Sequence, residues 1–324
     1  MSKKTVFALL VFCSIWAVLE FAFDVDFRGA ASLWLLLLYV VSYFLVHLIS
    51  KKDQQQIQED HKFKDWPTSG PIGHFGQKGL KFVFFATGLL TFLNPFQLFQ
   101  IVQQALGNFW LQIHPKNDID DPEQYSSPIQ YKLPFAPEEE WLVYNGGVTK
   151  YSSHSWQVLT QRFAYDFVIS NHTQRRHAGK GTFLTDYYCF GKPITAVADG
   201  TVIKVKNNQP NAPFVGYGVL DFVHRSFTGN YIIIQHAPNE YAFYAHLNPY
   251  SVTVKRGDFV VQGQHIGNCG HSGYSSEPHL HFHLQDGPSF FFSRGLPIKF
   301  SNITVNGITA KKTYITAGDK VKNS

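Results

Sequence analysis

The chain is poor in charge, in cysteine and in clustered arginine. Charged residues make up 16% of its 324 positions, below the roughly 25% of a typical soluble domain. The net charge of +5 is modest and comes without an arginine-rich block, so nucleic-acid binding is not expected. Phe and Tyr, in contrast, are abundant, with 30 and 16 copies. This balance favours a membrane region followed by one folded domain over two soluble domains.

Cysteine is also scarce, and its placement excludes one type of metal site. The three cysteines are Cys13, Cys189 and Cys269. Cys13 lies inside an apolar run, which leaves at most one disulfide, between Cys189 and Cys269. No CxxC spacing occurs, so a cysteine-based zinc site is excluded.

Two long apolar runs open the chain. The first, residues 6–23, is apolar except for Glu20, and by itself it is typical of a signal peptide. The second, residues 30–49, has no charge over 20 residues, which is the length that crosses a bilayer as a helix. Because the second run follows at once, we expect a hairpin of two transmembrane helices rather than a cleaved signal.

A third candidate is the uncharged stretch of residues 82–113, which contains Pro95. It predicts either a third span over 82–102 or an interfacial or re-entrant segment broken at Pro95. Lysines precede the stretch and acidic residues, among them Asp118 and Asp120, follow it. The positive-inside rule then puts the N-terminus in the cytoplasm. Three spans place the rest of the chain outside, and two spans leave it inside. The membrane region is thus 1–113, followed by a polar linker over 114–132.

From residue 133 to 324 the pattern is one of short β-type runs separated by turn signals. Residues 193–198 and 201–205 flank Asp199-Gly200 and predict a hairpin. Residues 231–236 and 241–247 flank Pro238-Asn239 and predict another. No helical periodicity is present. The expected fold class is all-β, a small antiparallel β-sheet domain preceded by two or three N-terminal transmembrane helices.

The most informative segment for chemistry is Pro278-His279-Leu280-His281-Phe282-His283-Leu284. Alternate side chains of a β-strand share one face. The three histidines therefore point one way, and the three apolar side chains point into the core. Packing alone is a poor explanation for such a face.

Two further polar residues lie in apolar strands upstream. Asp166 interrupts the apolar run Phe163-Ala164-Tyr165-Asp166-Phe167, and a buried carboxylate is costly unless it is paired or bound to a metal. His246 ends the run Tyr244-Ala245-His246-Leu247.

The order of these segments resembles the LytM/lysostaphin family of zinc endopeptidases. After Asp166 come Ala196-x-x-Asp199-Gly200-x-Val202, the His246 run, Gly257-Asp258-x-Val260, Gly263-Gln264-x-Ile266-Gly267-x-x-Gly270-x-Ser272-Gly273 and His279-Leu280-His281. The resemblance covers residues 134–300. It implies a zinc peptidase that cleaves peptide bonds of peptidoglycan. Together with the predicted spans, this makes the expected protein membrane-anchored, in the bacterial cytoplasmic or inner membrane with its domain on the outer or periplasmic side.

Carried over residue by residue, the resemblance makes Asp166 and His281 zinc ligands. It makes His246 and His279 the histidines that handle protons and the oxyanion. The family's usual first ligand is the histidine of His-x-x-x-Asp, a position that Arg162 occupies here. Arginine keeps its proton and does not bind zinc.

The third ligand is therefore open. His154 is favoured, because some members of the family resemble this chain in pairing an upstream histidine with a Gln-Arg-aromatic-Ala-x-Asp strand. His172 and His177 are alternatives, and so is a degenerate site. A degenerate site predicts a silent domain that binds the cell wall or activates a partner hydrolase. His236 is expected to be structural, and Tyr187, Tyr188 and Tyr274 are expected to line a groove or to pack in the core.

Overall fold

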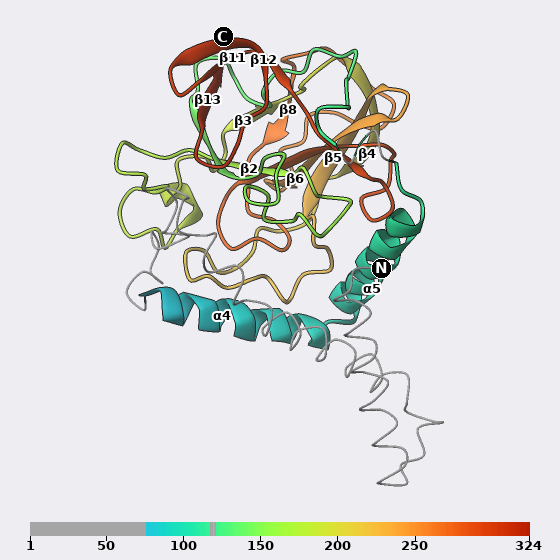
Figure 1. Ribbon diagram of the computed structural model, residues 1–324. Coiled ribbons are helices and arrows are strands. Elements are labelled where there is room, and N and C mark those ends of the chain that lie inside the picture. The colour runs from blue at the N-terminus through green and yellow to red at the C-terminus, as the bar shows by residue number, and fades with distance from the viewer. Residues whose placement is uncertain (1–75, 117–118, 120) are drawn as a thin grey trace, which may run out of the picture. The chain divides into compact units, whose positions relative to one another are not determined.

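The computed structural model describes residues 76–116, 119 and 121–324 (Figure 1). The described residues belong to one compact unit. The spans expected over 6–23 and 30–49, Cys13, Asp118 and Asp120 lie outside the described residues. The described helices are α4 (Gly76–Leu90), η3 (Thr91–Leu93), α5 (Pro95–Ile113) and η4 (Leu184–Asp186). The strands are β1 (Trp141–Asn145), β2 (Tyr165–Val168), β3 (Pro193–Thr195), β4 (Gly200–Lys206), β5 (Asn230–Ala237), β6 (Glu240–Leu247), β7 (Phe259–Val260), β8 (His265–Asn268), β9 (Leu280–Gln285), β10 (Gly295–Leu296), β11 (Phe300–Val305), β12 (Ile308–Thr313) and β13 (Lys320–Asn323).

Strands β1 to β13 form an antiparallel β domain, as the turn pattern predicts. The main sheet has the order β12-β11-β13-β1-β2-β9-β6-β5-β4-β7, with β10 paired to β9, and β3 and β8 form a second sheet. The expected hairpin of β5 and β6 is confirmed. In the middle of the main sheet, β2 and β6 flank β9 on either side. Leu280, Phe282 and Leu284 of β9 are completely buried in the core.

The hairpin predicted across Asp199-Gly200 is wrong. Strand β3 pairs with β8, whereas β4 pairs with β5 and β7. The intervening residues 196–198 are buried in the main core. The chain therefore passes from one sheet to the other here, because burying these apolar side chains requires it to continue through the core rather than fold back.

A sharp bend interrupts the predicted span over residues 82–102, at the position where the alternative of an interfacial or re-entrant segment places its break. The segments Lys81–Leu93 and Pro95–Ile113 are bent by 98°. Asn94 adopts an extended conformation, as residues before proline tend to do, and its side chain accepts hydrogen bonds from the backbone of Phe96 and Gln97 as the cap of α5. Among the described residues, no single helix meets the length and hydropathy of a membrane span, while the bent pair meets them jointly.

The segment over 114–132 packs on the β domain. Ile119 and Tyr131 belong to the main core, and Glu240 accepts hydrogen bonds from the hydroxyls of Tyr125 and Ser127 at 2.8 and 2.7 Å. The polar residues of this stretch thus serve partly as anchors to β6.

The two described cysteines are buried free thiols, so the single disulfide that the sequence permits is not formed. Burial, followed by the neighbouring Cys189, raises the pKa of Cys269 well above its usual value. This thiol is an unsuitable nucleophile.

Candidate metal centre

Three metal-binding side chains meet at one end of the central strands. Asp166 on β2 and His281 on β9 are direct partners in the sheet register. His281 Nδ1 lies 3.0 Å from Asp166 Oδ1, and His154 Nε2 lies 3.6 Å from Asp166 Oδ2. One donor atom from each residue falls within 4.8 Å of the other two. Among the described residues, these three side chains form the group whose donor atoms lie close enough together to hold a metal ion.

His154 reaches the group from a turn-rich loop that two glycines allow. Gly146 and Gly147 have φ values of 129° and 140°, which favour glycine. A Cβ on Gly146 would lie 2.7 Å from the carbonyl oxygen of Ala164. The chain therefore turns tightly against the start of β2, and Ser153 Oγ then closes the loop by donating to Arg162 O at 2.6 Å.

Two more histidines complete the cluster. The rings of His246 and His279 have centroids 4.7 Å apart, and His279 Nε2 lies 3.7 Å from Asp166 Oδ1. His246 Nδ1 donates to Ser272 O at 2.7 Å, and His279 Nδ1 donates to Glu277 O at 2.8 Å. In its neutral form, each ring then has its lone pair on Nε2.

His246 is also unusual in its backbone, with φ at 60°. Residues other than glycine rarely adopt this left-handed conformation, and strain of this kind clusters at functional sites. The conformation occurs at the end of β6, where the backbone N–H of His246 donates to Thr228 O at 3.1 Å.

The electrostatics of the cluster favour ionisation of Asp166 and lower the pKa of two of the histidines, His154 and His246. Burial opposes ionisation of Asp166, but His154, His279 and His281 outweigh it and lower the pKa well below its usual value. Burial, reinforced by His279 and His281, lowers the pKa of His246 well below its usual value. Desolvation also lowers the pKa of His154, against the pull of Asp166, although its side chain is 36% exposed. Metal binding requires an ionised carboxylate and imidazole nitrogens that carry a lone pair.

Side chains behind the donors hold them in place. Asn145 Nδ2 donates to Asp166 Oδ2 at 3.0 Å. His283 Nδ1 lies 3.2 Å from His281 Nε2, and His283 Nε2 lies 3.0 Å from Gln285 Oε1. Partners of this kind orient metal-binding rings. The two-residue period of a strand predicts that His283 lies on this face. The roles of Asn145 and Gln285 are not predicted by the sequence. The only sequence signal near Asn145 is the Gly146-Gly147 turn.

Arg162, which stands at the usual ligand position, turns toward an aromatic ring. Its guanidinium lies 5.0 Å from the centroid of the Trp156 ring, and its Nε donates to Trp156 O at 3.2 Å. Arg162 therefore braces the loop that carries His154.

The other candidate residues lie elsewhere. His172 is exposed, and His177 is buried against the ring of Tyr187; neither joins the donor group. His236 donates from Nδ1 to Asp199 O at 2.8 Å, as a structural histidine would. Tyr187 is buried and donates to Gly181 O at 3.2 Å, so it does not line an open groove.

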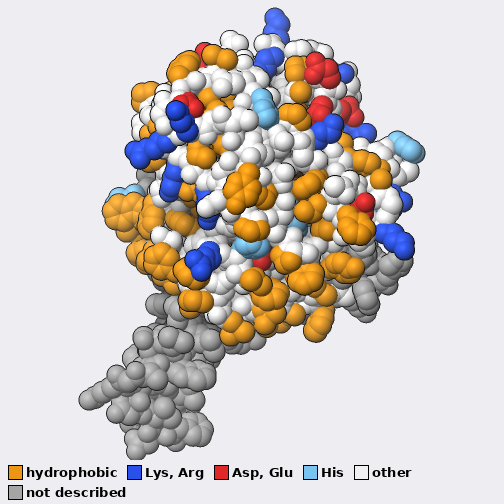
Figure 2. Space-filling view, turned by 180° about the vertical axis from the view of Figure 1, so that it is seen from behind, with side chains coloured by type: hydrophobic (Ala, Val, Ile, Leu, Met, Phe, Trp, Pro, Cys, Tyr) orange, Lys and Arg blue, Asp and Glu red, His pale blue; other side chains and the backbone are white. Residues whose placement is uncertain are grey.

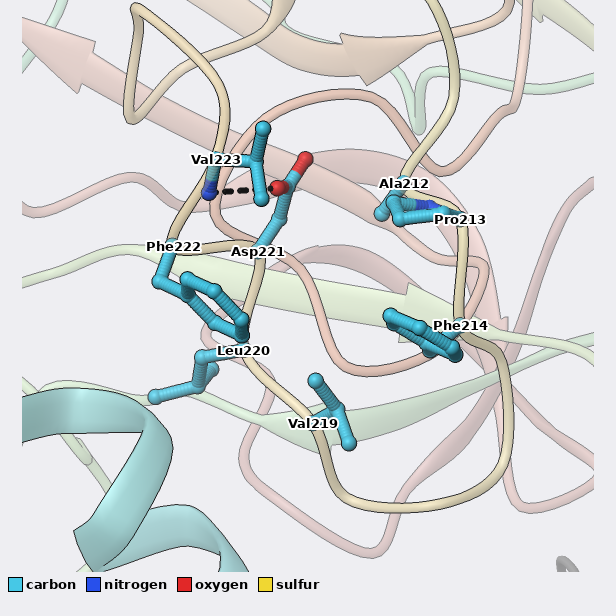
Figure 3. Close-up of a pocket in the computed structure, with 8 residues that line it drawn as sticks. All are labelled: Ala212, Pro213, Phe214, Val219, Leu220, Asp221, Phe222 and Val223. Atoms are coloured by element: carbon cyan, nitrogen blue, oxygen red, sulfur yellow. Dashed lines mark hydrogen bonds between the residues drawn. The ribbon is translucent and has the colours of Figure 1, made fainter. Parts of the chain in front are cut away.

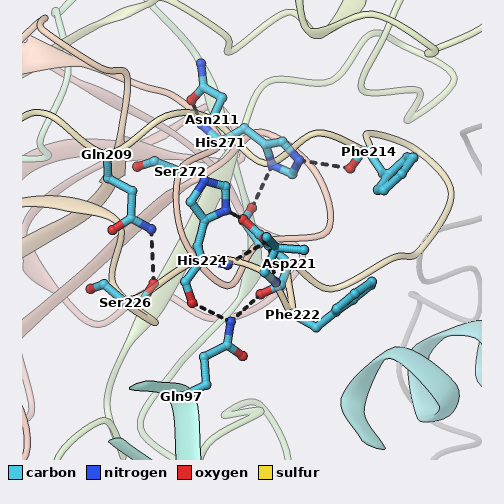
Figure 4. Close-up of polar contacts among 12 residues, drawn as sticks. Gln97, Gln209, Asn211, Phe214, Asp221, Phe222, His224, Ser226, His271 and Ser272 are labelled. Atoms are coloured by element: carbon cyan, nitrogen blue, oxygen red, sulfur yellow. Dashed lines mark hydrogen bonds and ion pairs between the residues drawn. The ribbon is translucent and has the colours of Figure 1, made fainter. Parts of the chain in front are cut away.

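The connection from β4 to β5, residues 207–229, is hydrogen-bonded to the loop over residues 269–279, in which Ser272 O accepts from His246 Nδ1. Asn211 Oδ1 accepts from the backbone N–H of His271 at 3.0 Å (Figure 4), and Ser272 Oγ accepts from Asn230 N at 2.9 Å. A pocket in this connection is lined by residues 212–214 and 219–223 (Figure 3).

The comparisons with known proteins concern the β domain that carries this cluster. Residues 184–291 match the model of peptidase family M23. Peptidoglycan DD-endopeptidases ShyA and ShyC of Vibrio cholerae are 32% identical over 94 residues and 37% identical over 99 residues. Lysostaphin of Staphylococcus simulans is 34% identical over 93 residues. The family model and these relatives support the M23 family for this part of the chain.

The aligned regions are short compared with the proteins. They cover 29%, 30% and 28% of this chain, and 17%, 18% and 15% of ShyA, ShyC and lysostaphin. The family match contains His246, His279 and His281, whereas His154 and Asp166 precede it.

Proposed function

We propose that this chain is a zinc endopeptidase that hydrolyses peptide bonds of bacterial peptidoglycan. The observation that carries the proposal is the meeting of His154, Asp166 and His281 within 4.8 Å. Tetrahedral zinc ligands at about 2.0–2.2 Å from the metal stand roughly 3.4 Å apart. The 3.6 Å between His154 Nε2 and Asp166 Oδ2 suits this spacing. Two imidazoles and a carboxylate are also ligands that zinc prefers in catalytic sites, where a fourth position stays open.

The chain's own residues supply the remaining chemistry. When bound, zinc lowers the pKa of a water and polarises a peptide carbonyl. His246 and His279 lie beside the donor group, and because Nδ1 of each donates to a carbonyl, Nε2 is the nitrogen that remains to exchange a proton. One of these nitrogens would accept a proton from the attacking water and pass it to the leaving amine, and the other, once protonated, would stabilise the oxyanion.

A silent domain that binds the cell wall or activates a partner hydrolase is the second candidate function. Arg162 favours it, because this residue removes the usual first ligand. The position of His154 beside Asp166 favours the enzyme, and so do the strained backbone of His246 and the neutral state that burial gives this residue.

We also propose that residues 1–113 anchor the chain in the bacterial cytoplasmic or inner membrane, with the β domain on the outer or periplasmic side. The support is the uncharged run over 30–49 and the charge asymmetry around 82–113. A reporter fused to the C-terminus should be active outside the membrane. Activity of a cytoplasmic reporter instead would remove peptidoglycan as the substrate.

The enzyme proposal is tested by measuring zinc content and release of new amino groups from purified peptidoglycan in parallel, with the full chain in detergent. His279→Ala should retain zinc and lose hydrolysis, because its Nε2 serves the reaction. His265→Ala, which removes an exposed histidine paired with Asn268, should retain both. Zinc-loaded wild-type protein that releases no amino groups would establish the silent domain.

A further inference from the structure

The bent pair of helices α4 and α5 has an apolar outer face. Large apolar side chains are exposed along both helices, and Leu93 at the bend and Phe99 on α5 are 79% and 63% exposed. The stretch of residues 82–113 contains no Asp, Glu, Lys or Arg. Figure 2 shows apolar side chains gathered toward the lower edge of the molecule. We call this the elbow face, made of the exposed apolar side chains Phe82, Leu89, Leu93, Phe99, Leu106 and Trp110.

The opposite side of α5 is polar and faces the β domain. Its side chains follow a helical spacing of three or four residues, so they share one face. Asn94 Nδ2 lies 3.0 Å from Val223 O, Gln97 Nε2 donates to Asp221 O at 2.7 Å (Figure 4), and Gln100 Nε2 donates to Arg225 O at 2.8 Å. The amide side chains of the helix thus hydrogen-bond to the connection between β4 and β5.

Farther along α5, side chains on the same side form hydrogen bonds with the loop that contains His154. Asn108 Oδ1 accepts from the backbone N–H of Leu159 at 2.7 Å, and Gln104 Nε2 donates to Thr160 Oγ1 at 3.0 Å. Gly107 lies against the backbone at Phe291, where an added Cβ would come within 1.7 Å of the carbonyl oxygen. These contacts hold α5 against the β domain, so the apolar side chains of the helix point away from that domain.

We propose that a lipid surface covers the elbow face, with the bend between α4 and α5 inserted foremost. Uncharged apolar side chains outside and amides inside are the division expected of a helix that lies in a bilayer interface. Exposed Lys81 and Arg225, whose guanidinium lies 4.8 Å from the Phe96 ring centroid, suit lipid headgroups at the rim. The chain that leads into α4 contains the uncharged run over 30–49, long enough to cross a bilayer and so to bring the elbow to it.

This proposal rests on the membrane anchoring proposed above and is independent of zinc chemistry. A bend of 98° prevents a flat surface from meeting both helices along their full length. Leu93 at the bend should therefore insert more deeply than Phe82 or Ile113 at the far ends. The loop that carries His154 is then held beside the membrane by α5.

The test uses the full chain with Cys13→Ser, reconstituted into vesicles of phosphatidylcholine and phosphatidylglycerol. Cys189 and Cys269 are buried and stay in place. A polarity-sensitive dye is attached to Leu93→Cys, Phe99→Cys or Phe82→Cys, and to Ile308→Cys on β12 as the control, since Ile308 is also 75% exposed. Lipids with a nitroxide in the acyl chain should quench the dye at 93 most, at 99 and 82 less, and at 308 severalfold more weakly than at 93.

Quenching at 93 and 99 no stronger than at 308 would overturn the proposal. A blue-shifted dye at 93 without lipid quenching would also overturn it, because residues 1–64 or a second copy of the chain would then cover the face. Circular dichroism of each labelled protein checks that it is folded. Vesicles that retain the protein without quenching at 93 reject the elbow face alone, whereas loss of the protein from vesicles rejects the anchoring.

Discussion

The three proposed zinc ligands lie on two different kinds of structure, paired central strands and a turn-rich loop. Asp166 and His281 sit on paired central strands, and both residues are more than nine-tenths buried. His154 sits in a turn-rich loop, and its side chain is 36% exposed. Sheet register dictates the distance between the first two donors, whereas the position of His154 depends on hydrogen bonds within its loop and from α5. Metal affinity should therefore respond to remote changes around the loop, and fold stability to changes on the strands.

The largest effect is expected from His281→Ala. Removing one of three ligands should cost roughly a third of the 10–16 kcal/mol that structural zinc sites gain, about 3–5 kcal/mol. Zinc affinity, measured by competition with a chelating dye, should fall more than 100-fold. Circular dichroism should still report a folded β domain. An unchanged affinity would remove His281 from the ligand set.

His154→Ala should lower zinc affinity as strongly as His281→Ala does. The two variants should differ in the stability of the metal-free protein, because His154 lies in a loop and His281 on a central strand. Because the side chain is partly exposed, the free energy of unfolding in a chelator should change by no more than about 0.5 kcal/mol. His281→Ala should destabilise the metal-free protein by about 1–3 kcal/mol, since it opens a buried site. Denaturant unfolding of both variants checks this. Equal destabilisation would show that the loop is as much part of the core as the strands.

Asn108→Ala tests the grip of α5 on the loop. Asn108 Oδ1 accepts from Leu159 N at 2.7 Å, so its removal should let His154 move and lower zinc affinity about tenfold. Asn171→Ala is the matched control, because Asn171 caps its own turn through Thr173 and Arg175. If both asparagine variants bind zinc like the wild type, α5 does not position the ligand.

Arg162→Ala should have the smallest effect on zinc. The guanidinium braces Trp156 rather than entering the donor group, so its loss should weaken affinity less than Asn108→Ala does. The same chelator competition measures it. A loss as large as that of His154→Ala would mean that the loop depends chiefly on the pair of Arg162 and Trp156.

The strand side of the site was readable from the sequence, because strands repeat every two residues. The alternation over His279–Leu284 placed the histidines on one face and the apolar residues in the core, as observed. Asp166 stood out because an apolar run tolerates a carboxylate poorly. The register that makes Asp166 the partner of His281 is a long-range property and was not readable.

The loop and the elbow were less predictable. The approach of His154 to Asp166 depends on hydrogen bonds such as that from Ser153 Oγ to Arg162 O, which have no sequence period. The break at Pro95 was one of two interpretations of an uncharged stretch, since composition does not distinguish a straight apolar helix from a bent one. The amide side chains of α5 bond to backbone carbonyls of the β domain, and such long-range partners leave no pattern in the sequence.

The central claim is that His154, Asp166 and His281 hold one zinc ion. Anomalous diffraction at the zinc edge, from crystals of the zinc-loaded protein, tests it most directly. We predict a single peak about 2.0–2.2 Å from a nitrogen of His154, a nitrogen of His281 and a carboxylate oxygen of Asp166. Absence of a peak at saturating zinc, or a peak more than about 4 Å from His154, would contradict the account.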